Sequence, residues 1–155
     1  MLNYILETPV EVTTIEFHPN NNDIIIGGCV NGQVIVWDLR SAEHRIVAGG
    51  RKIEVAKMPD EETDKTQQAF VRCKHVAISE IAESHKNFVA DIQFIPNGVK
   101  VDKKNPTQGK SQHFVSVAED GRLLIWDTRE CDKDKIKERE ATGKKFVWKP
   151  SQPAL

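Results

Sequence analysis

Apolar residues of this 155-residue chain lie in short runs, and two sets of three runs follow one another in the same order. The first run reads VTTIEFHP from Val12 and VADIQFIP from Val89, with apolar residues and a closing proline at equivalent positions. The second runs cover 23–28 and 113–118, and the third runs end in Trp-Asp. The pattern therefore predicts a duplicated unit of three strands.

Tight turns are predicted between the second and third strands of each unit. Asn31-Gly32 and Asp120-Gly121 stand at these places, and such dipeptides favour a type I′ hairpin because they tolerate positive φ. Proline ends the first strand of each unit, since it cannot donate to a sheet ladder. Each unit is therefore expected to be an antiparallel meander.

The third strands show no polar alternation. Residues 34–37 and 123–126 are apolar throughout, so both faces of each strand must be covered by protein. A lone sheet cannot cover itself on both faces, whereas the radially packed blades of a β-propeller can. The pattern predicts an all-β fold built from packed blades.

A family resemblance rests on these residues. Two hairpins that end in Trp-Asp, each after a Val-x-x-Ile-x-Phe strand, resemble WD40 repeats. The resemblance implies two blades of a WD40-type β-propeller, each a four-stranded antiparallel sheet, in a ring that this chain does not close, since propellers have about 4–8 blades. The repeat signature comprises Asn31, Gly32, Trp37, Asp38, Gly121 and Asp127.

The second unit also resembles the buried polar tetrad of the family, with His85, Ser116, Asp120 and Trp126. In such a network the Asp holds one imidazole nitrogen, and the Ser hydroxyl bonds the other nitrogen and the indole N–H. The first unit has Asn31 and Gly27 in place of the Asp and Ser, and lacks the His. We therefore expect the turn of the second blade to be held more firmly.

Trp37 and Trp126 are separated by about twice the usual repeat period of ~40–45 residues. We interpret 1–9 as an N-terminal segment or the outer strand of a preceding blade, and 10–82 as the first blade. A long polar insertion at 41–73 then precedes the outer strand at 75–81. The second blade covers 83–150, with insertions at 97–112 and 130–144 and an outer strand at 145–148, and 151–155 form a tail.

The charged run at 132–140 has two interpretations. Its close mixture of signs is typical of a solvated connector, which we favour, and it is also compatible with an exposed helix that docks a partner.

Composition restricts the function further. Lys plus Arg number 22 and Asp plus Glu 23, and this balance argues against a nucleic-acid partner, whose phosphates demand a basic excess. No apolar run approaches the roughly 18 residues of a membrane helix, which argues against a membrane partner. Three scattered cysteines, Cys29, Cys73 and Cys131, fit free thiols in a reducing, cytoplasmic setting.

No catalytic, cofactor or metal site is expected. Ser116, His85 and Asp120 have the residue types of a hydrolase triad, but Ser116 lies in mid-strand, where a nucleophile is not exposed. Cys73 and His75 lack a second ligand pair at zinc spacing. We therefore predict a protein that is not an enzyme and has no small-molecule substrate.

The endings WDLR and WDTR place Arg40 and Arg129 after the two Trp-Asp pairs. They resemble the WDxR motif of propellers that act as substrate receptors in cullin ubiquitin ligases, in which case both arginines would contact an adaptor. Alternatively, each arginine stacks or pairs across blades, since an arginine at this place is common in WD repeats.

A closer resemblance is carried by GGCVNGQVIVWDLR, the acidic insertion after it and VAISEIAESHKNFVADIQFI. Together they are similar to the axonemal dynein intermediate chains of the inner-arm type, over most of 10–150. The resemblance implies a scaffold in the cilium, within the axonemal cytoskeleton, that holds dynein heavy chain and other intermediate and light chains. We expect the chain to be a fragment of a longer protein, or to pair with blades from elsewhere.

Overall fold

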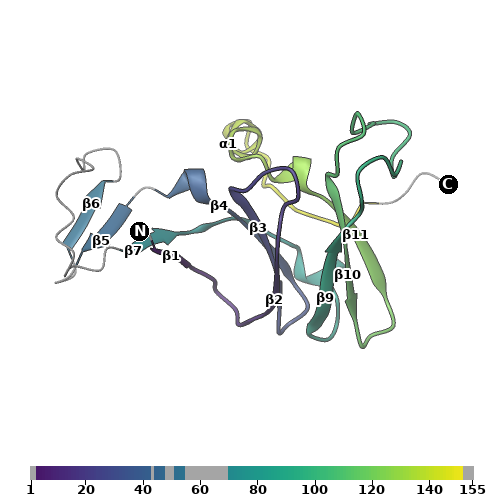
Figure 1. The fold of residues 1–155 in the computed structure, drawn as a ribbon, viewed down its shortest axis with the longest axis horizontal. Coiled ribbons are helices and arrows are strands. Elements are labelled where there is room, and N and C mark those ends of the chain that lie inside the picture. Colours follow the sequence, from purple (N-terminus) through teal and green to yellow (C-terminus); the bar gives the residue numbers. More distant parts are fainter. Residues whose placement is uncertain (1–2, 43, 48–50, 55–69, 152–155) are drawn as a thin grey trace.

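A computed structural model of the chain describes residues 3–42, 44–47, 51–54 and 70–151. Three sheets follow one another along its long axis, and a short helix lies across one end of two of them, the sheets that contain the Trp-Asp strands (Figure 1). Strand pairing in these two sheets is antiparallel throughout, and the ring is open. The predicted class, partial WD40-type blades, is confirmed.

The first blade has four strands in the order β2-β3-β4-β8. They are β2 (Val12–Phe17), β3 (Ile24–Cys29), β4 (Val34–Asp38) and β8 (His75–Ile78). The outer strand β8 forms inside the stretch predicted for it and pairs antiparallel with β4.

The second blade has three strands, β9 (Val89–Phe94), β10 (His113–Ala118) and β11 (Leu123–Asp127), and the expected outer strand at 145–148 is wrong. Trp148 forms only an isolated parallel bridge with Ser79, at the end of the first blade. Its buried ring lies 5.0 Å from that of Trp126 and 6.0 Å from that of Phe114. Burial of this indole draws the backbone away from β11, which receives only the Ser151 N–H at the Ile125 carbonyl, 2.7 Å away.

The polar insertion of the first blade contains strands that the sequence did not predict. It includes β5 (His44–Val47), β6 (Arg51–Glu54) and β7 (Phe70–Cys73), while 43, 48–50 and 55–69 lie outside the described residues. These strands form a third sheet in the order β1-β7-β5-β6. Because β5 follows β4 and β7 leads into β8, the insertion prolongs the outer hairpin of the blade.

The N-terminal strand β1 (Asn3–Leu6) belongs to this third sheet, where it pairs parallel with β7. Within the segment interpreted as 1–9, residues 3–6 thus pair with a strand of the first blade's insertion. Glu7 N–H continues the pairing at the Cys73 carbonyl, 2.9 Å away, and Leu6 packs on the first blade.

Both hairpin turns depart from the predicted type I′ geometry, in which two residues have positive φ. Only the glycine of each pair does, at 94° for Gly32 and 75° for Gly121. Gly32 N–H donates to the Cys29 carbonyl at 3.1 Å, and Cys29 N–H donates to the Gln33 carbonyl at 2.9 Å. This is a three-residue loop whose glycine forms a bulge.

Short helices follow the sheet strands. The 3₁₀ turns η1 (Leu39–Ser41) and η4 (Thr128–Cys131) come directly after the Trp-Asp pairs, and η3 (Ile81–Glu83) follows β8. The charged run forms α1 (Lys133–Ala141), whose first N–H groups are capped by Asp132. Ile136 is its one buried residue, so the charged side chains of α1 face solvent.

The main core lies between the two blades. It joins Ile26, Val34 and Val36 of the first blade to Ile92, Phe114 and Trp126 of the second, with Trp148 and Ile136 closing one side. A second cluster lies on the opposite face of the first blade, around Ile25, Ile35 and Trp37. The fully apolar strand β4 is thus buried on both faces, as its pattern predicts.

The two blades meet at close range where β2 and β3 approach β9. Thr13 Oγ1 donates to the Val89 carbonyl at 2.6 Å, and a Cβ on Gly28 would lie 2.5 Å from Cγ1 of Val89. Gly28 therefore permits the backbone approach that brings the blades together. At the rim, Asn20 Nδ2 donates to Asn97 Oδ1 of the other blade at 3.0 Å.

Candidate functional site

The structure brings the four predicted tetrad residues together in the second blade. His85 Nε2 lies 2.8 Å from Ser116 Oγ, which also accepts the Trp126 indole N–H at 2.8 Å. His85 Nδ1 lies 3.1 Å from Asp120 Oδ2. Four residues from an entering loop, two strands and a turn thus form one continuous hydrogen-bonded chain.

Local structure determines the position of each member. Ser116 and Trp126 lie on β10 and β11 with their side chains on the face toward the first blade, and Asp120 occupies the turn between these strands. Asp120 also accepts the backbone N–H groups of Lys86, at 2.9 Å, and Arg122, at 3.0 Å. Although desolvation opposes its ionisation, these bonds and the one to His85 lower the pKa of Asp120.

Asp120, His85 and Ser116 contact one another in the same succession as the residues of a hydrolase triad, but the Ser116 hydroxyl is not accessible to a substrate. Ser116 is 0% exposed, and its hydroxyl is engaged by both His85 and the indole of Trp126. A substrate carbonyl therefore has no route to the hydroxyl oxygen, and the arrangement can link the blade's elements but cannot act as a nucleophile.

In the first blade, the tryptophan indole N–H has a different hydrogen-bond acceptor. The Trp37 indole N–H donates to the Glu7 carbonyl at 2.8 Å, so the N-terminal segment supplies the acceptor. A Cβ on Gly27 would lie 2.8 Å from the ring of Trp37, which explains why glycine stands where the second blade has Ser116. Sequence reasoning missed Glu7, because a backbone acceptor leaves no signal in residue type.

The turn of the first blade also has its own network. Asn31 Nδ2 donates to Gln33 Oε1 at 2.7 Å, and Gln33 Nε2 donates to the Ser79 carbonyl at 2.6 Å. The Gly32 carbonyl accepts the His85 N–H at 3.2 Å, so this turn touches the entering loop of the second blade. Gln33 is a buried polar residue, and sequence reasoning missed this arrangement.

The Asp of each Trp-Asp pair begins a 3₁₀ turn and holds the arginine two residues on. Asp38 and Asp127 accept the backbone N–H of Arg40 and Arg129, at 3.0 and 2.9 Å. The same carboxylates hold the guanidinium groups at 2.8 and 2.7 Å. These hydrogen bonds, and then the Coulombic attraction, raise the pKa of Arg40; for Arg129 the hydrogen bonds to Asp127 are again the largest cause of the raised pKa.

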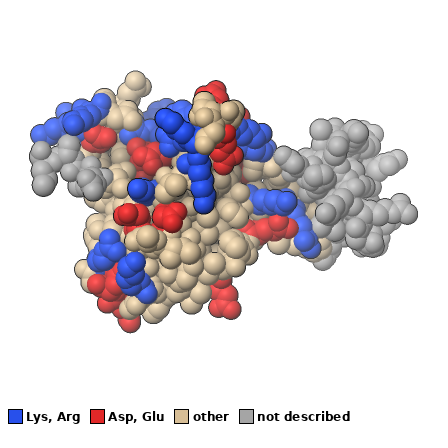
Figure 2. Space-filling model, turned by 180° about the vertical axis from the view of Figure 1, so that it is seen from behind, with Lys and Arg blue, Asp and Glu red and all other residues tan. Residues whose placement is uncertain are grey.

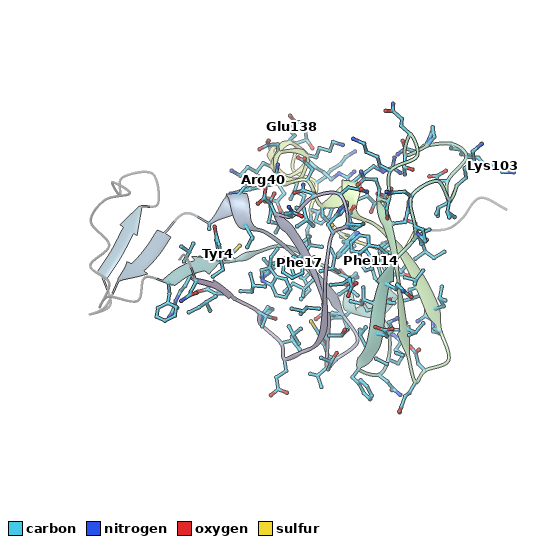
Figure 3. The ribbon with its side chains drawn as sticks, viewed as in Figure 1. Tyr4, Phe17, Arg40, Lys103, Phe114 and Glu138 are labelled. Carbon is cyan, nitrogen blue, oxygen red and sulfur yellow. The ribbon has the colours of Figure 1, made fainter. Side chains whose placement is uncertain are left out.

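The two arginines lie at the same end of the blades and line one groove of about 330 Å³. Arg40, Glu138 of α1 and Lys103 of the 97–112 loop all stand at this end (Figure 3). Arg129 is held further by the carbonyls of Asn105 and Pro106, so its guanidinium is engaged within its own blade. Both guanidinium groups thus pair with a carboxylate of their own blade, and not across blades as the alternative expected.

Cys73 and His75, the ligand pair considered from the sequence, do not form a metal site with other described residues. Cys73 lies with its sulfur 3.3 Å from the Asp38 carbonyl, and burial raises the pKa of its thiol. Within the described part of the chain, no group of three or more His, Cys, Asp and Glu side chains could hold a metal ion. No helix found there is long and apolar enough to cross a membrane.

Strand order, the Trp-Asp corners and the tetrad together define a pair of WD-repeat propeller blades. Residues 2–151 match the family described as the dynein axonemal intermediate chain 3 WD40 domain. The chain belongs to that family.

Individual relatives agree with this assignment. The dynein axonemal intermediate chain 3 of Danio rerio is 34% identical over 131 residues, and that of Mus musculus is 28% identical over 135 residues. These alignments cover 80% and 81% of this chain, but only 13% and 14% of the relatives. A guanine nucleotide-binding protein subunit beta-like protein of Encephalitozoon cuniculi is 24% identical over 139 residues, which cover 76% of this chain and 39% of that protein.

Proposed function

We propose that this chain is a non-catalytic scaffold segment of an axonemal dynein intermediate chain. In this role it docks dynein heavy chain and other intermediate and light chains in the cilium. The family match across 2–151 is the observation that carries the proposal. The buried tetrad supports it, because the residues with catalytic potential are used to hold a blade together.

Two open apolar faces support an assembly role. On the first blade, Ile15 and Phe17 lie on the face opposite the second blade and are 51% and 59% exposed. On the second blade, the outward face carries Val115, Ile125 and Leu123, the last 59% exposed. Paired faces of this kind pack on further blades in propellers, so we propose that additional blades cover both.

The test is affinity purification of the full-length protein from ciliated cells, with the recovered proteins identified by mass spectrometry. We expect dynein heavy chain and a second intermediate chain among the partners. Their recovery should be the same with and without nuclease treatment. Recovery of a cullin adaptor without dynein subunits would overturn the proposal and favour the ligase alternative. In that case Arg40→Ala with Arg129→Ala should release the adaptor.

A further inference from the structure

A second groove at the charged end of the molecule is built by segments that lie outside the regular strands. It encloses about 540 Å³ between the 97–112 loop, the corner after β11, α1 and residues 146–151. Lys and Arg side chains, mixed with acidic ones, gather along this end of the molecule (Figure 2). The groove thus belongs to the insertions that distinguish the second blade from a regular WD repeat.

The floor of this groove is apolar. Ile136 of α1, Phe146 and Val147 line it, and Ile136 is continuous with the core between the blades. Phe146 is half-buried, with the Arg139 guanidinium 6.0 Å from the centre of its ring. This surface can therefore receive one or two apolar side chains.

Three cations around the floor form no ion pair with a described carboxylate, whereas two of the acids have hydrogen-bond partners. Lys135, Arg139 and Lys149 are exposed, and none forms an ion pair with a described carboxylate. Asp127 is held by Arg129. Asp102 accepts the backbone N–H groups of Lys104 and Asn105.

Glu130 is the remaining acid of the lining. Desolvation, and then the nearby Asp127 carboxylate, raise the pKa of Glu130, while Arg139 and Arg129 lower it. The lining therefore carries four cations against three acids, and three of the cations, Lys135, Arg139 and Lys149, are exposed beside the apolar floor.

We propose that this groove binds an extended acidic peptide segment of a protein partner, with carboxylates at Lys135, Arg139 and Lys149 and an apolar side chain on Ile136 and Phe146. The apolar floor favours such a peptide over nucleic acid, because a nucleic-acid groove stacks bases on free aromatic faces. The Phe146 ring is half-buried, with the Arg139 guanidinium 6.0 Å from its centre, and is not such a face. The proposal goes beyond the scaffold function and does not depend on dynein.

The probe is a fluorescein-labelled peptide of glutamates with two leucines, titrated with the full chain and followed by fluorescence anisotropy. We expect saturable binding that weakens with salt, and binding at least tenfold weaker when glutamine replaces the glutamates. Lys135→Glu with Arg139→Glu and Lys149→Glu should weaken binding at least tenfold. The matched control combines Lys103→Glu, Lys104→Glu and Lys137→Glu, which make the same charge change at exposed positions outside the groove lining.

Equal binding by the groove triple and the unaltered chain would overturn the proposal. So would an equal loss in both triples, since attraction would then be non-specific, or tighter binding of single-stranded DNA of the same charge. If circular dichroism shows that the charge reversals disturb the fold, Gln replaces Glu at the same three positions. Because no dynein subunit is used, these outcomes leave the scaffold proposal to its own test.

Discussion

Ser116 shows how one hydroxyl can satisfy two buried nitrogen atoms in the second blade. Its oxygen lies 2.8 Å from both His85 Nε2 and Trp126 Nε1, in a position with no exposure to solvent. Removing a shared partner of this kind leaves the buried nitrogen atoms unsatisfied, which costs more than one ordinary hydrogen bond contributes.

We expect Ser116→Ala to lower the free energy of unfolding by about 1–3 kcal/mol, because both nitrogen atoms lose their partner without regaining water. In a Trp126→Phe background the same change should cost less, since the indole N–H is already absent. Urea denaturation of the two single variants and the double variant measures this coupling. Equal losses in both backgrounds would show that the Ser116–Trp126 bond contributes nothing to stability.

At the scale of elements, the two hairpin turns use the same glycine geometry in different surroundings. Gly32 and Gly121 both have positive φ, at 94° and 75°. A Cβ on Gly32 would lie 2.0 Å from the His85 carbonyl oxygen, whereas nothing lies within 4 Å of one on Gly121. Alanine in place of Gly121 therefore causes only backbone strain, with no steric clash.

Gly121→Ala is expected to destabilise the chain by about 1–2 kcal/mol, the cost of a left-handed residue with a side chain. Gly32→Ala should cost clearly more, because the first turn must also move away from the entering loop of the second blade. Thermal unfolding followed by circular dichroism compares the two variants directly. A smaller shift in Tm for Gly32→Ala than for Gly121→Ala would contradict the close packing of turn and loop.

At the scale of the whole molecule, the two blades are joined by backbone approach as well as by side-chain packing. Gly28 faces Val89 at a distance that leaves no space for a methyl group, and Thr13 bonds the Val89 carbonyl beside it. Phe17 and Leu123 on the two outward faces are exposed. The chain therefore has the form of one interblade contact with a partly exposed apolar face on either side, and the two blades lie next to each other in Figure 1.

Gly28→Ala should destabilise the interblade contact by about 1–3 kcal/mol, the range for overpacking in a filled core. Val89→Ala alone should also destabilise, through the cavity it leaves. The double variant is expected to lose less than the sum of the two, because Val89→Ala removes Cγ1, the atom nearest to the new methyl group, although the Cβ of residue 89 stays 2.6 Å away. Additive losses in chemical denaturation would mean that the two side chains do not compete for the same volume.

The sequence by itself determined the strands whose pattern is local. The Trp-Asp strands β4 and β11 and their partners β3 and β10 follow from apolar runs bounded by turn residues, and the tetrad follows from residue types at fixed places in the repeat. The strands depend on neighbours along the chain, so periodicity and spacing reveal them, whereas the tetrad was expected from the resemblance to WD40 repeats.

Only the tertiary structure decided where the less regular segments lie. Residues 145–148 read as a strand, but the Trp148 side chain is buried between the blades and its backbone forms only an isolated bridge with Ser79. Residues 3–6 pair with β7, which lies far along the chain, and the indole of Trp37 takes its acceptor from Glu7. Such choices depend on which distant surface is free to be covered, and a local pattern carries no information about that.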